Sequence, residues 1–229
     1  MVRRAARLVA VLATLVPLLA VAAPADAALP MIARVKGLAD ARQIVTVTNR
    51  SWTSAYATLQ AFEKRSDGTW RSVFGPWTAR VGRNGFGSPK REGDGQTPVG
   101  SYHLTGMFGV NASPGTRFGW LRVDRSDVWV DDSYSGYYNL HRRLPANGRW
   151  RSAESMYQPG AYSYAGVIAY NPLRRPGLGS AIFLHVTTNS ATAGCVSLPA
   201  SQLVPILRWL DPAKAPRIVM GPESYITYR

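Results

Sequence analysis

The stretch AIFLHVTTNSATAGCVSL, residues 181–198, decides the prediction of the fold around it. An apolar run ends at His185, a small polar loop follows, and the turn 192–194 then presents Cys195. A short, continuously apolar and partly β-branched run is typical of a buried strand, and strands often deliver functional side chains to the loops at their ends. The sequence therefore predicts a buried strand over residues 181–186 that ends at a candidate site.

Cys195 is the only cysteine in the chain, so it cannot form a disulfide within the chain. A thiol has an ordinary pKa of about 8.5 and needs a base to supply thiolate at neutral pH. His185 lies ten positions upstream and would serve as that base if the loop 187–192 folds back. The backbone amides of Ala193, Gly194 and Cys195 would form an oxyanion hole. The alternative is an inert, buried cysteine that packs as a small apolar side chain.

Residues 1–27 have the pattern of a secretory signal peptide. The positive segment at its start contains Arg3, Arg4 and Arg7. An apolar segment follows over residues 8–23, and Ala25-Asp26-Ala27 provides a cleavage pattern of small residues. We expect cleavage near Ala27 and export to the periplasm, the cell wall or the medium; the alternative is an uncleaved membrane anchor. Residues 28–229 would then form a single domain of 202 residues.

The chain is strongly basic, with a net charge of +14, which removal of the signal peptide lowers by 2 to +12. A basic protein inside a cell would suggest nucleic acid, but an exported one meets anionic wall polymers and lipid surfaces instead. We therefore expect anionic cell-wall polymers as partners, and no nucleic acid. The three histidines, at positions 103, 141 and 185, show no metal-ligand spacing. Asp131 and Asp132 would point to opposite faces of a strand, so we expect neither a metal nor a cofactor.

Alternating apolar and β-branched residues predict a mainly β domain with one clear helix. The expected strands cover residues 43–48, 55–64, 69–73, 77–81, 101–104, 121–124, 127–132, 165–170, 181–186 and 217–220. Asp67-Gly68 lies between two of these runs and is a strong hairpin signal. The spacing of Leu203, Leu207 and Leu210 predicts a helix over residues 201–210.

Two motifs in this order resemble the L,D-transpeptidase catalytic domain family. The first is Gly95-Gln96-Thr97-Pro98-Val99-Gly100, which looks like the Thr-Pro-x-Gly loop of that family. The second is His185 with the turn 192–195 and the following residues 196–198. The resemblance covers roughly residues 83–220 and implies a mixed β-sandwich-like fold with one or two short helices. It also implies a cysteine nucleophile that attacks peptidoglycan stem peptides, releases the terminal D-Ala and passes the acyl group to an amine on a neighbouring stem.

The sequence departs from this family at two positions of the second motif. Ala193 occupies the place of a second histidine, and Ser197 that of a frequent arginine. The resemblance still assigns the base to His185, while substrate binding is expected of four other residues, namely Thr192, Tyr170, Arg174 and Arg175. Residues 157–175 are the expected lid. Two alternatives stay open, a hydrolase that trims stem peptides with the same nucleophile and a catalytically silent, basic wall-binding domain.

Overall fold

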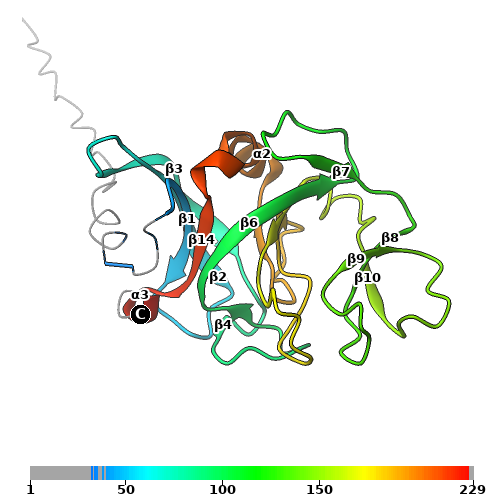
Figure 1. Cartoon of the computed structure of the whole chain (residues 1–229). Helices are drawn as coiled ribbons and strands as arrows, with labels where there is room; N and C mark the ends of the chain where they lie inside the picture. The colour runs from blue at the N-terminus through cyan, green and yellow to red at the C-terminus, as the bar shows by residue number, and fades with distance from the viewer. Residues whose placement is uncertain (1–31, 33, 36–37, 39, 227–229) are drawn as a thin grey trace, which may run out of the picture.

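The computed structural model describes residues 32, 34–35, 38 and 40–226 (Figure 1). The expected signal peptide lies outside the described residues, so cleavage near Ala27 stays a prediction. The regular elements, in chain order, are β1 (Gln43–Asn49), β2 (Tyr56–Lys64), β3 (Trp70–Arg80), β4 (Phe86–Gly87), β5 (Thr97–Pro98), β6 (Gly100–Gly109), β7 (Trp120–Arg122), β8 (Asp127–Val130), β9 (His141–Arg143), β10 (Ala153–Ser155), β11 (Ala165–Ile168), β12 (Phe183–Val186), β13 (Val196–Leu198), α2 (Ala200–Trp209), the short 3-10 helix η1 (Pro212–Lys214), β14 (Arg217–Pro222) and α3 (Glu223–Ile226).

The main sheet has nine strands in the order β11-β12-β13-β3-β2-β1-β14-β6-β7. Strand β11 pairs with β12 on one side and with β6 on the other, so the sheet closes on itself. The pairs β1–β14, β12–β13 and β6–β7 are parallel, while the remaining pairs are antiparallel. This arrangement confirms the predicted fold, a mainly β, sandwich-like mixed sheet with two short α-helices. Closure also pairs most of the strand edges that an open sheet would expose.

The predicted hairpin at Asp67-Gly68 is confirmed, because β2 and β3 are antiparallel neighbours on either side of it. The structure joins the two strands expected at 69–73 and 77–81 into the single strand β3. A bulge near Gly75 allows this, since the register with β2 shifts there. Gly75 has φ +85°, and a side chain at this position would meet the carbonyl oxygen of Leu59 at 2.4 Å. The bulge therefore needs a glycine.

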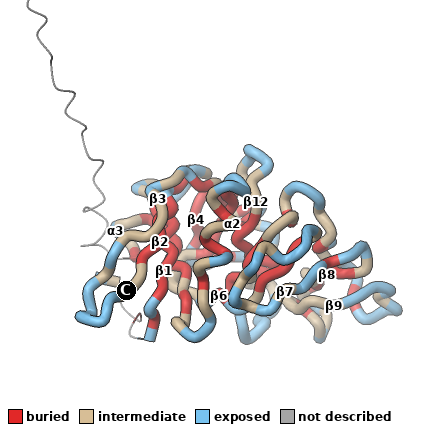
Figure 2. The backbone as a smooth tube through the Cα atoms, turned by 90° about the horizontal axis from the view of Figure 1, so that it is seen from above, coloured by how far each residue is buried: buried red, intermediate tan, exposed pale blue. Residues whose placement is uncertain are grey.

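The core lies between the facing parts of the closed sheet and under helix α2 (Figure 2). Leu203, Ile206 and Leu207 lie on one face of α2 and are completely buried in this core. The same cluster contains Leu184 of β12 and Val196 of β13, the two strands that flank the candidate nucleophile. The strands that carry the site are therefore fixed by the core behind them.

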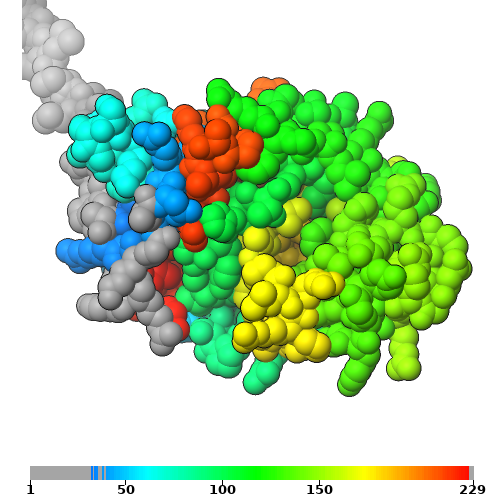
Figure 3. Space-filling model, viewed as in Figure 1, coloured from blue at the N-terminus to red at the C-terminus, as the bar shows by residue number. Residues whose placement is uncertain are grey.

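A smaller sheet, in the order β10-β8-β9, forms one end of the molecule, opposite the strands β1 to β3 (Figure 3). Val128, Val130 and Trp150 form its own apolar cluster. Trp129 of β8 packs edge-to-face on Phe183 of β12, with ring centroids 5.1 Å apart. This contact holds the small sheet against the strand that leads to His185.

Candidate active site

The turn that carries Cys195 is held by hydroxyl groups from two directions. Thr192 Oγ1 donates to the carbonyl oxygen of Cys195 at 2.7 Å and accepts from the amide of Gly194 at 3.1 Å. Thr97 is completely buried; its hydroxyl donates to the carbonyl of Gly194 at 2.8 Å and accepts from the amide of Gly82 at 2.9 Å. The two motifs recognised in the sequence therefore meet in space, and Thr97 positions the turn of the second motif.

Gly194 is required by the shape of this turn. Its φ of +152° is rarely adopted by other residues, and a side chain there would meet the carbonyl oxygen of Gln96 at 2.9 Å. The segment that lies this close to Gly194 is the Thr-Pro-x-Gly loop of the first motif, which contains Gln96.

The thiol of Cys195 is buried between backbone groups of the preceding strand. Its Sγ accepts from the amide of Phe183 and donates to the carbonyl of Ala181, each at 3.3 Å. Burial raises the pKa of this thiol to about 12, and the negative charge of Glu154 acts in the same direction. Cys195 is therefore protonated at neutral pH and needs a proton acceptor before it can act as a nucleophile.

His185 lies on β12, and its parallel neighbour on β13 is Ser197. Paired residues of neighbouring strands point to the same face of a sheet, so His185 and Ser197 share a face. Cys195 is two positions before Ser197, and all three residues line the same cleft. Its Nδ1 lies 2.8 Å from the carbonyl oxygen of Val186. A carbonyl only accepts, so Nδ1 carries the proton and Nε2 is the basic nitrogen. Burial lowers the pKa of His185, which keeps the imidazole neutral.

No hydrogen bond joins His185 to Cys195 in the described structure, because the thiol bonds to the two backbone groups of Phe183 and Ala181 instead. The structure therefore brings the predicted pair into one cleft without joining them directly. Hydrogen bonds between a nucleophile and its base often tighten only around the substrate.

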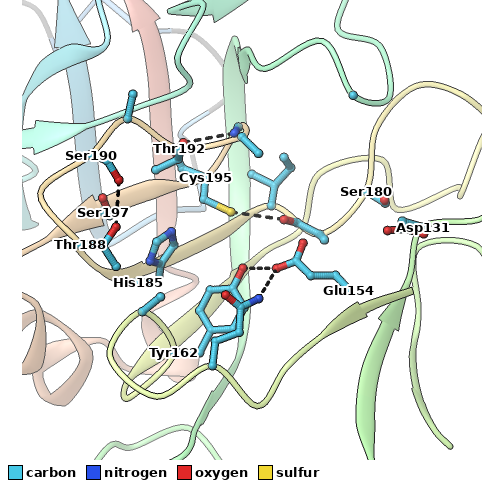
Figure 4. A pocket seen from close by; sticks show the side chains of 18 of the residues that line it. Asp131, Glu154, Tyr162, Ser180, His185, Thr188, Ser190, Thr192, Cys195 and Ser197 are labelled. Atoms are coloured by element: carbon cyan, nitrogen blue, oxygen red, sulfur yellow. Dashed lines mark hydrogen bonds between the residues drawn. The ribbon is translucent and has the colours of Figure 1, made fainter. Parts of the chain in front are cut away.

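The cleft has a volume of about 470 Å³, and Cys195 lies in its wall (Figure 4). Its lining also includes the predicted residues His185, Thr192, Ala193 and Gly194. The amide of Gly194 is bonded to Thr192, so it does not point freely into the cleft. Of the predicted oxyanion-hole amides, those of Ala193 and Cys195 remain as candidates.

Three carboxylates and one buried cation face the cleft from other parts of the chain, and the sequence did not predict any of them as site residues. They are Glu92, Asp131, Glu154 and Lys90. Lys90 forms an ion pair with Asp94, with Nζ and Oδ1 2.7 Å apart. Glu154 belongs to β10 of the small sheet and accepts a hydrogen bond from Tyr162, which also lines the cleft. Tyr162 lies within the expected lid, residues 157–175, whereas Glu154 lies just before it.

Three of the four residues expected to bind substrate lie outside the lining of this cleft in the described structure. Tyr170 donates its hydroxyl to the carbonyl of Leu178 at 2.7 Å. Arg174 is exposed and donates to the carbonyl of Gly136 at 3.1 Å, and Arg175 is exposed in the same loop. Thr192 lines the cleft, but its hydroxyl is used within the turn.

Two further observations concern metal binding and membrane-spanning helices. In the described part of the chain, no group of three or more His, Cys, Asp or Glu side chains is placed to hold a metal ion. None of the described helices is long and apolar enough to cross a membrane.

A lone buried thiol and a basic imidazole nitrogen line one cleft of a mixed sheet, and these are the two groups that a cysteine nucleophile and its base require. Comparison with models of protein families identifies the family of the chain. The model of the L,D-transpeptidase catalytic domain (YkuD) matches residues 57–219, or 163 of the 229 residues, and the chain belongs to this family. No curated protein and no solved structure matches the chain in the corresponding searches.

Replacement of Thr97 by valine tests the link between the two motifs. Valine keeps the shape but leaves the buried amide of Gly82 and the carbonyl of Gly194 without their partner. We expect the free energy of unfolding to fall by about 1–3 kcal/mol, measured by guanidinium denaturation. The matched control is Thr58→Val on the exposed face of β2, which should change stability by less than about 0.5 kcal/mol. Equal stability of both variants would contradict the role given to Thr97.

Proposed function

We propose that this chain is an exported L,D-transpeptidase that works through an acyl-enzyme on Cys195. The observation that carries the proposal is the position of the chain's only thiol in the wall of a cleft that His185 also lines, in a member of this family. Family membership implies peptidoglycan stem peptides as substrates. That the acyl group passes to an amine, and not to water, is part of the proposal.

In the proposed reaction, the thiolate of Cys195 attacks a carbonyl carbon of the stem peptide. The carbonyl oxygen becomes an oxyanion next to the amides of Ala193 and Cys195. The C–N bond then breaks, the departing amine takes up a proton, and the acyl group stays on sulfur as a thioester. An amine of a second stem attacks the thioester, loses a proton to a base and restores the thiol. His185, with its basic Nε2, is the predicted base of this cycle.

The charge of the cleft supports a substrate that carries amines. Glu92, Asp131 and Glu154 line it together with a single Lys or Arg residue, Lys90, and Lys90 is already paired with Asp94. Such a lining favours ammonium groups over carboxylates. Lys90 is also the basic side chain best placed to meet a substrate carboxylate, the role expected of Arg174 and Arg175.

Export and a basic surface complete the proposal. The pattern of residues 1–27 supports cleavage near Ala27 and function outside the cytoplasmic membrane. The net charge of +12 after cleavage supports attraction to anionic cell-wall polymers. In this setting the enzyme would contribute to cell-wall biogenesis and cell shape.

Intact mass spectrometry with two reagents tests the function. A carbapenem that acylates Cys195 opens its β-lactam ring and expels nothing, so the protein should gain the whole mass of the drug. Muropeptides with tetrapeptide stems should yield cross-linked dimers if the enzyme is a transpeptidase and trimmed monomers if it is a hydrolase. Absence of both an adduct and a product would favour a silent wall-binding domain.

A further inference from the structure

The hydroxyl of Tyr162 lies between the thiol of Cys195 and the carboxylate of Glu154 (Figure 4). Tyr162 donates its proton to Oε1 of Glu154, and its hydroxyl points toward the sulfur of Cys195, where it acts to lower the pKa of the thiol. All three side chains line the cleft. A neutral phenol between a thiol and a carboxylate can accept a proton on one side while it donates one on the other.

The position of Tyr162 is fixed by aromatic contacts. Its ring packs edge-to-face on Phe108 and Phe183, with centroids 5.6 Å away in both cases. A third edge-to-face contact joins it to His185 at 5.2 Å. The residue is only 4% exposed, and burial holds the pKa of its hydroxyl well above the ordinary value. Tyr162 therefore stays a neutral phenol with its hydroxyl held at the thiol.

Glu154 is a mostly buried carboxylate, and in the part of the chain that the structure describes no cation pairs with it. Within the described residues its side-chain partners are Tyr162 and Gln158, whose Nε2 lies 3.3 Å from Oε1. Burial raises the pKa of Glu154, and the nearby charges of Asp131 and Glu92 act in the same direction. A buried carboxylate of this kind is expensive to keep ionised, so it is poised to accept a proton.

We propose that Tyr162 and Glu154 form a proton relay that receives the thiol proton of Cys195. The proposal rests on the proposed role of Cys195 as nucleophile and adds a route for its proton. Tyr162 would exchange a proton with the reacting sulfur directly and would be a catalytic residue. Glu154 acts through Tyr162 and sets the direction of its hydrogen bond.

The relay moves two protons and leaves the net charge of the three groups unchanged. The S–H group, which donates to the carbonyl of Ala181 in this structure, turns toward Tyr162. Its proton then passes to the phenol oxygen of Tyr162 while the phenol proton passes to Glu154. The products are a thiolate, a neutral phenol that now donates to sulfur, and a neutral carboxylic acid that donates to the phenol. No further reactant is needed. Reversal of the same two transfers restores the thiol after the acyl group has left.

This route explains how a thiol without a hydrogen bond to His185 becomes reactive. The basic Nε2 of His185 is then free to exchange protons with the departing and the incoming amine. Lys90, the one Lys or Arg residue in the lining of this cleft, acts to lower the pKa of Cys195 and so favours the thiolate.

The relay and a purely electrostatic role of Glu154 predict opposite results. The negative charge of Glu154 raises the pKa of the thiol, so its removal alone should make Cys195 more reactive. Loss of a relay should make Cys195 less reactive. The sign of the change in Glu154→Gln therefore distinguishes the two roles.

The test measures the rate at which iodoacetamide and a carbapenem modify Cys195 in the folded protein between pH 5 and 9. We expect Glu154→Gln and Tyr162→Phe each to lower both rates by about 10²-fold or more, and the double variant to fall little further. In the unsubstituted protein the rate should fall as the pH drops through the pKa of Glu154, above the ordinary value of 4.5. This fall in rate at low pH, the acidic limb of the pH profile, should be absent in Glu154→Gln.

Matched controls are Glu63→Gln and Tyr102→Phe. Both residues are hydrogen-bonded, Glu63 to Lys214 and Arg71 and Tyr102 to the carbonyl of Val99, and neither lines the cleft. Their rates should match those of the unsubstituted protein. Circular dichroism melting curves of all variants separate a lost relay from a lost fold.

The outcomes separate the relay from the proposed function. If the unsubstituted protein reacts with the carbapenem and Glu154→Gln reacts as fast or faster, the relay is overturned and the nucleophile stands. If the carbapenem does not react at all, the proposed function fails, and alkylation by iodoacetamide still decides whether the relay delivers thiolate. A slower alkylation with loss of the acidic limb supports the relay in either case.

Discussion

Cys195→Ala is expected to lose all covalent capture of a carbapenem and to form cross-linked or trimmed muropeptides at least about 10⁴-fold more slowly than the unsubstituted protein. The physical reason is the absence of any substitute for the sulfur. Cys195 is the chain's only cysteine, and the two hydroxyls that hold its turn, those of Thr192 and Thr97, are bonded to backbone groups. Initial rates of product formation and intact mass measure the loss.

Two comparisons make this result specific. Cys195→Ser keeps the size of the side chain but replaces the thiol with a hydroxyl, which ionises far less readily, so its rate should stay close to that of Cys195→Ala. Both variants should keep the fold, since the thiol is one small member of the cluster around Phe183. A folded Cys195→Ala that still forms product would show that another group carries the chemistry.

Most of the fold could be predicted from local patterns of apolar and β-branched residues in the sequence. The strands alternate or run apolar as expected, and the Asp67-Gly68 turn joins β2 to β3. The pairing of β12 with β13 is the reason that His185 and Cys195 share a cleft, and this pairing connects residues only twelve positions apart. Short connections of this kind are the ones that sequence patterns describe best.

The parts of the site that the sequence missed come from distant segments. Glu154 lies on a strand of three residues in the small sheet, and it reaches the cleft only because that sheet packs on β12 through Trp129. Tyr162 precedes β11, which places it beside His185 by pairing with β12. No local periodicity marks either residue, and the one available signal was the density of tyrosines between residues 134 and 170.

The two arginines expected to bind substrate lie outside the lining of the cleft in the described structure. Arg174 and Arg175 are close in sequence to the site, but their loop folds onto itself. The side chain of Asn171 bonds to the carbonyls of Arg175 and Gly179, and this closure carries both arginines away from the cleft. Lys90, which is far from Cys195 in sequence, lines the cleft instead.

Phe183→Ala should produce the largest loss of stability among core substitutions near the site. Phe183 is completely buried and makes edge-to-face contacts with Phe108, Trp129 and Tyr162. Truncation of a buried phenylalanine removes its transfer free energy and leaves a cavity, so we expect a loss of about 3–5 kcal/mol. Guanidinium denaturation followed by tryptophan fluorescence measures it, because Trp129 reports on this cluster directly.

Phe183→Leu is the matched control, since it keeps most of the apolar volume and should cost about 1.5 kcal/mol or less. The two variants also separate packing from chemistry. The amide of Phe183 that donates to the thiol is unchanged in both, whereas the wall that holds Tyr162 against Cys195 is lost only in the alanine variant. A Phe183→Ala protein that is folded should therefore also react more slowly with iodoacetamide than Phe183→Leu. Equal stability of the two variants would mean that the ring contacts of Phe183 do not join the small sheet to the site.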